Sequence, residues 1–64
     1  MVKFTLLTED RRAVWINPEH VTAVFGDEDS ATIHVVGYHS LGIRVFESLD
    51  DVIEEIIMAE VKTK

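Results

Sequence analysis

The chain contains no cysteine, so neither a disulfide nor a thiolate metal site can stabilise it. At 64 residues it has room for one domain, and a domain of this size hides only about 60% of the surface that its unfolded chain exposes. Without cross-links, such a domain needs very good packing or association with another copy. We therefore expect a single domain over residues 1–64 that self-associates as a dimer or a larger homo-oligomer.

Long apolar runs are also missing. No segment approaches the roughly 20 apolar residues of a membrane span, and the N-terminal apolar stretch is too short for a signal peptide. Basic residues are few, since 6 Lys and Arg stand against 12 Asp and Glu and give a formal net charge of −6. Phosphate binding depends on clustered Lys and Arg. We expect a cytoplasmic protein with no membrane partner, and the charge disfavours nucleic acid.

Motifs with catalytic or metal-binding spacing are absent as well. His20, His34 and His39 lack the i, i+4 spacing of a helical zinc motif; His34 and His39 can face each other across a hairpin mouth, but no carboxylate accompanies them. The acidic clusters at 27–29 and 50–55 are typical of a turn and a solvated helix face, and the first lacks the spacing of a calcium loop. We predict no catalytic residue, metal or cofactor, and a protein that is not an enzyme.

The clearest local pattern predicts a helix over residues 47–57. Ser48 followed by Asp51 matches a capping box, and further acids complement the helix dipole. Apolar residues at three- and four-residue steps predict one buried stripe: Leu49, Val52, Ile53, Ile56 and Ile57. On this basis Ile53→Asp should unfold the domain, whereas Glu54→Lys should leave it folded.

Five short strand patterns precede this helix. They are expected at residues 2–7, 13–16, 20–25, 31–36 and 43–46. Pro18, with Asn17 as its cap, is expected to open a single helical turn between the second and third strands. Connections this short favour antiparallel pairing. The predicted fold is α+β, a small antiparallel sheet of four to five strands followed by one C-terminal α-helix packed on one sheet face.

Apolar side chains occupy both faces of this predicted sheet. Ile33 is expected to oppose Val45, and Val35 to oppose Ile43, which places all four under the helix. Alternate strand residues point the other way, so one helix cannot cover every apolar residue, and the remainder indicates an interface. Trp15 is interpreted first as a core residue and second as an interface anchor. The candidate interface residues are Trp15, Val36, Phe46 and Met58.

Three strings carry a resemblance to a known family. They are MVKFTLL at 1–7, INPE at 16–19 and ESLDDVIEEII at 47–57, and over nearly the whole chain they resemble the small FlbD/SwrD-type proteins of bacterial flagellar gene clusters. The resemblance implies a cytoplasmic, non-enzymatic protein that assists flagellar function or swarming by acting on other proteins. It implies no catalytic residue.

Two hypotheses of function follow. The first is a non-catalytic, self-associating protein-interaction module, similar to flagellar accessory proteins, that binds through the sheet face around Trp15 or through the exposed side of the helix. The alternative is a small acidic regulator, of the phage type among others, that contacts nucleic acid or inhibits a nucleic-acid-binding protein by mimicking phosphate.

Overall fold

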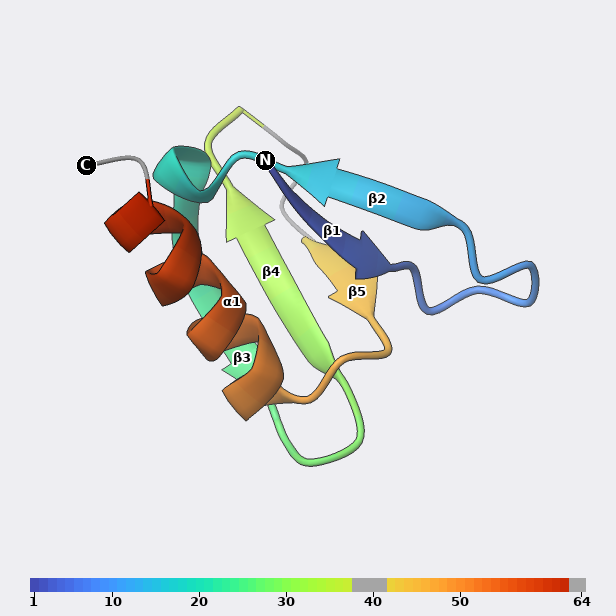
Figure 1. Cartoon of the computed structure of the whole chain (residues 1–64). Coiled ribbons are helices and arrows are strands. Elements are labelled where there is room, and N and C mark those ends of the chain that lie inside the picture. The colour runs from blue at the N-terminus through green and yellow to red at the C-terminus, as the bar shows by residue number, and fades with distance from the viewer. Residues whose placement is uncertain (38–41, 63–64) are drawn as a thin grey trace.

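All five strands and the C-terminal helix are present in the computed structural model, which describes residues 1–37 and 42–62 (Figure 1). In chain order the elements are β1 (Val2–Thr5), β2 (Ala13–Ile16), the 3₁₀-helix η1 (Pro18–His20), β3 (Val21–Gly26), β4 (Ala31–Val35), β5 (Ile43–Val45) and α1 (Leu49–Lys62). Every strand pairing is antiparallel. The prediction of a small α+β fold is confirmed.

The strands form two sheets, so the prediction of one sheet with four to five strands is wrong. β1 pairs with β2, and a separate sheet has the order β3-β4-β5. A single bridge between Leu6 and Val45 connects them, and the Leu7 N–H donates to the Arg44 carbonyl beside it at 2.9 Å. The sheets stay separate because β1 ends at Thr5 and meets β5 only beyond that end.

Side-chain caps hold the local turns in the predicted way. The Asn17 carboxamide oxygen accepts a hydrogen bond from the Glu19 N–H at 3.0 Å, and Pro18 begins η1. At the start of α1, the Ser48 hydroxyl accepts from the Asp51 N–H at 3.2 Å. Each oxygen satisfies an N–H that has no partner within the first helical turn, which confirms both predicted caps.

The β4–β5 register differs from the prediction by two residues. Ile33 opposes Ile43, and Ala31 opposes Val45, so the predicted pairs are wrong. Within residues 1–37 and 42–62, the last two residues of β4 pair with β3 and not with β5. Because a shift of two residues keeps each side chain on its face, Ile33, Ile43 and Val45 are still buried.

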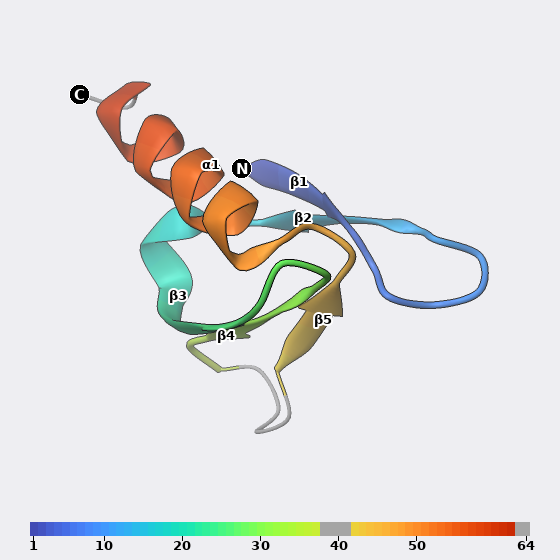
Figure 2. The ribbon, with the colours of Figure 1, turned by 90° about the horizontal axis from the view of Figure 1, so that it is seen from below.

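The core lies between the two sheets and the helix, which packs against β1, β3 and η1 (Figure 2). Its buried members are Val2, Phe4, Ile16, Ala31, Ile33, Ile43, Val45 and Val52. Between positions 49 and 60 of α1, Val52 is the buried residue, at 0% exposure, and Leu49 and Ile56 are half-buried. No helix in the described residues has the length and apolar character to cross a membrane.

The buried stripe of α1 is narrower than predicted. Ile53 is 40% exposed and Ile57 is 54% exposed. With about 100° per residue, positions 52 and 56 lie within a narrow arc that faces the sheets, whereas 53 and 57 lie at one side of it. Two small sheets cover only that arc, so the prediction that Ile53 and Ile57 are buried is wrong.

Candidate interaction surface

The outer edge of β2 has no strand beside it in the described part of the chain, where β2 pairs with β1 alone. The Leu6 N–H donates to the Arg12 carbonyl at 2.8 Å. Hydrogen-bonded and non-hydrogen-bonded pairs alternate along an antiparallel ladder. In the register of this hairpin, Ala13 and Trp15 therefore direct their N–H and C=O groups away from β1.

Bonds on the far side of β1 support this alternation. Thr5 opposes Ala13, yet its N–H donates to the Glu47 carboxylate at 3.0 Å and its carbonyl accepts from the Phe46 N–H at 2.9 Å. Both backbone groups of Thr5 thus point away from β2. In a non-hydrogen-bonded pair the two partners point their groups in opposite directions, so those of Ala13 point to the outer edge of β2.

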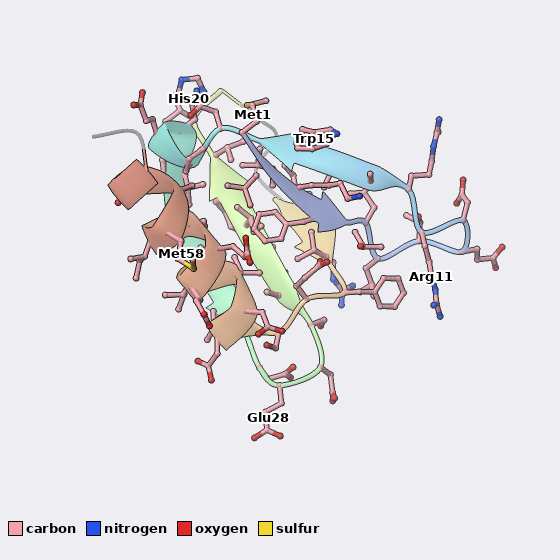
Figure 3. The ribbon with its side chains drawn as sticks, in the orientation of Figure 1. Met1, Arg11, Trp15, His20, Glu28 and Met58 are labelled. Carbon is pink, nitrogen blue, oxygen red and sulfur yellow. The ribbon has the colours of Figure 1, made fainter. Side chains whose placement is uncertain are left out.

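Trp15 lies on this edge strand with its side chain 59% exposed (Figure 3). It opposes Lys3, on the face of the hairpin that turns away from the core, whereas Phe4 and Val14 oppose each other on the inner face. The interpretation of Trp15 as a core residue is therefore wrong. An exposed tryptophan beside unpaired backbone groups is a common anchor in protein interfaces.

An open hollow of about 370 Å³ lies next to the same edge. Its lining is mostly apolar and comes from the N-terminus, β2, η1, β4 and β5: Met1, Val14, Trp15, Ile16, Asn17, His20, Val35 and Ile43. Within residues 1–37 and 42–62, no backbone ladder joins β2 to β4 or β5. Among those residues, the hollow lies between the two sheets with no strand across it.

The other predicted interface residues lie on different elements. Val36 follows β4 and is exposed, and its N–H donates to the His20 carbonyl at 2.8 Å, which places it near the hollow. Phe46 is partly covered, because the Arg11 guanidinium lies 4.9 Å from its ring centroid. Met58 is exposed on α1, well separated from Trp15 (Figure 3). The predicted residues do not form one patch.

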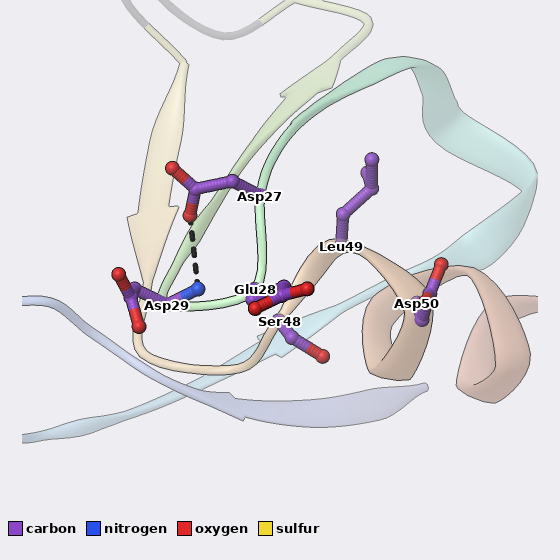
Figure 4. A pocket seen from close by; sticks show the side chains of 6 residues that line it. All are labelled: Asp27, Glu28, Asp29, Ser48, Leu49 and Asp50. Carbon is purple, nitrogen blue, oxygen red and sulfur yellow. Dashed lines mark hydrogen bonds between the residues drawn. The ribbon is translucent and has the colours of Figure 1, made fainter.

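Acidic groups gather where the β3–β4 turn meets the start of α1. An open hollow of about 550 Å³ lies between them, and its lining residues are Asp27, Glu28, Asp29, Ser48, Leu49 and Asp50 (Figure 4). The Leu49 N–H donates to the Asp27 carbonyl at 2.9 Å and ties the turn to the helix. The Asp27 carboxylate accepts from the N–H groups of Asp29 at 2.9 Å and Ser30 at 3.2 Å. These two bonds hold the pKa of Asp27 below its usual value.

The histidines have no metal-binding arrangement within the described residues, where no three His, Asp or Glu side chains are placed to hold an ion. His34 meets Phe25 edge-on, with ring centroids 5.3 Å apart, and His20 lines the hollow beside β2. The predicted approach of His34 and His39 lies outside the described residues.

No protein-family model, curated protein or solved structure matches this chain.

Sequence reasoning missed two surfaces. The hollow beside β2 depends on the division into two sheets, and strand periodicity carries no signal for that division. The exposure of Ile53 and Ile57 did have a signal, because Asp50 and Glu54 share the same side of the helix. Acids next to an apolar pair on the helix surface indicate that the pair lies at the margin of the buried stripe.

Proposed function

We propose that the protein is a non-catalytic interaction module that self-associates by pairing the outer edge of β2 with the same edge of a second copy. The observation that carries this proposal is the unpaired β2 edge beside exposed Trp15 and an apolar hollow. The strand reads Ala-Val-Trp-Ile and contains no charge or proline. Edge strands that avoid pairing usually carry such residues, so this edge is open to a partner strand.

Two-fold symmetry limits how the two copies pair. An axis perpendicular to the sheet makes the two β2 strands antiparallel and keeps inward side chains opposite inward ones. The pairing therefore centres on Val14 or on Trp15. In the Val14-centred register the outward groups of Ala13 and Trp15 bond to each other across the axis. In the Trp15-centred register Trp15 faces its own copy, and Ala13 faces Asn17, whose carbonyl already accepts from the His20 N–H. In both registers the two hairpins become one continuous sheet.

Sedimentation equilibrium tests this self-association. We expect the wild type to pass from monomer to dimer as concentration rises, and Trp15→Lys to remain monomeric because it places a charge at the new interface. Thr8→Lys is the matched control, since Thr8 is exposed and lies outside β2. Trp15 is the only tryptophan, so its emission should shift to the blue as the dimer buries it. A wild type that stays monomeric at the highest concentration would refute the proposal.

The setting that we propose is cytoplasmic, and the resemblance to FlbD/SwrD-type proteins favours an accessory role in flagellar function or swarming. Deleting the gene in the organism that encodes it and measuring swarming tests this part separately. Normal swarming would remove the flagellar role and leave the self-association proposal intact.

The alternative function, a regulator that contacts nucleic acid or inhibits a nucleic-acid-binding protein, stays a prediction. The acids around the hollow in Figure 4 favour its phosphate-mimic form. A pull-down separates the two, because recovery of polymerase or nuclease components favours the regulator and recovery of flagellar components favours the accessory protein.

A further inference from the structure

The outward side of α1 combines apolar and acidic side chains. Positions 50, 53, 54 and 57 follow the i, i+3, i+4, i+7 spacing of one helical face, and they hold Asp50, Ile53, Glu54 and Ile57. All four side chains are exposed. The two isoleucines form an apolar strip along the helix axis, and the two carboxylates lie beside it.

The acidic turn between β3 and β4 extends this face past the N-terminal end of the helix. Asp27 is tied to the helix start through the Leu49 N–H, and the turn lies across the hollow from Asp50 (Figure 4). Between positions 49 and 60, every charged residue of α1 is acidic. Lys3 lines a hollow with Asp51, Glu54 and Glu55 on the flank toward β1, so Glu54 lies between this lysine and the two isoleucines. The Ile53–Ile57 strip is therefore bordered by negative charge.

This charge identifies the kind of partner that fits. A second copy would set the same acids against these ones, and each chain carries a formal charge of −6. Anionic lipid surfaces and nucleic acids are repelled for the same reason. A basic amphipathic helix complements both features, because its apolar side covers the isoleucines while Lys or Arg at its borders meets the carboxylates.

We propose that the outward face of α1 docks a basic amphipathic helix of a partner protein, with Ile53 and Ile57 as the apolar contacts and Asp50 and Glu54 as the charged ones. The proposal is independent of self-association through β2, because the two surfaces lie on different sides of the molecule (Figure 1). The two proposals also predict opposite effects of salt. Salt screens the repulsion between two acidic copies and favours the dimer, whereas it weakens binding of a basic helix.

Isothermal titration calorimetry with a synthetic peptide tests this docking. The probe is a helical peptide of leucine and lysine with the leucines on one side, and its control has the same composition in scrambled order. We expect saturable binding of one peptide per chain that weakens with salt. The double variant Ile53→Ser/Ile57→Ser should weaken binding about tenfold or more, because it removes the apolar contact without changing the charge.

Controls keep the result specific to this face. Met58→Ser removes an exposed apolar side chain from the other flank of α1 and should leave the affinity unchanged. Trp15→Lys, which is expected to be monomeric, should bind the peptide as the wild type does. Equal affinity for the scrambled peptide, unchanged affinity of the double variant, or no binding at all would each overturn the proposal, whether or not the protein dimerises.

Discussion

Gly26 occupies a backbone conformation that another residue cannot adopt without strain, with φ at 155° where β3 enters the turn. A Cβ built there would lie 2.7 Å from the Ala31 Cα, so the facing strand would have to move. We expect Gly26→Ala to lose about 1–3 kcal/mol through backbone strain alone, and more through this clash. Urea denaturation measures the loss.

Gly37→Ala is the matched control for that substitution. Gly37 has a φ of 80°, but among the described residues a Cβ there would meet no atom within 4 Å. It should therefore cost only the penalty of a left-handed residue, about 1–2 kcal/mol. If the two variants lost the same free energy of unfolding, the Cβ at position 26 would be accommodated without a clash.

Asp27 makes the stability of the β3–β4 turn depend on pH. Hydrogen bonds from Asp29 and Ser30 lower its pKa in the folded state, so its contribution is present above the unfolded-state pKa and is lost as pH falls through the folded-state pKa. Asp27→Asn keeps an acceptor oxygen but does not titrate. We expect the wild type to be more stable than this variant at neutral pH and the two to converge in acid, as measured by urea unfolding. A folded-state pKa at or above the usual value, measured by NMR, would contradict this account.

At the scale of the elements, α1 contacts the core through a narrow arc. Val52 is fully buried, so Val52→Asp places an unpaired charge in the core at a cost of about 3–5 kcal/mol. A small domain has roughly that much stability in total, and we expect the variant to be unfolded by circular dichroism. Ile53→Asp should remain folded, at a cost of about 1 kcal/mol, because Ile53 lies at the margin of the arc. If Ile53→Asp were unfolded, Ile53 would belong to the buried face of the helix, as the periodicity predicts.

The elements differ in how far the sequence predicts them. The caps at Asn17 and Ser48 are correct because a side chain there bonds to a backbone group only two or three residues away. The β4–β5 register and the division into two sheets are wrong because both depend on contacts between distant segments. The bridge between Leu6 and Val45 is one such contact, and no local pattern marks it.

The same limit applies to the candidate surfaces. Composition and apolar excess predict that some apolar area stays uncovered, and Trp15 is part of it. The location of this uncovered area could not be predicted, because whether Trp15 faces the core depends on which residue of β1 opposes it. The outward pairing with Lys3 decides that question, and it is a property of the hairpin as a whole.

For the whole molecule, small size favours self-association and the negative charge opposes it. Its core contains few fully buried side chains, so one copy is expected to be only marginally stable, and the proposed pairing through β2 would add to that stability. A formal charge of −6 on each copy opposes association. Pairing therefore has to use an uncharged part of the surface, and β2 is such a part.

Self-association of this kind couples thermal stability to concentration. A partner that binds only the folded state raises the melting temperature by mass action, so we expect the Tm of the wild type to rise with protein concentration. Added salt should raise it further, since screening reduces the repulsion between the acidic copies. Trp15→Lys should melt at one temperature across the same concentrations, and differential scanning calorimetry measures both proteins. A wild-type Tm that does not change with concentration would mean that folding and association are not linked, and the β2 edge would then have no role in stability.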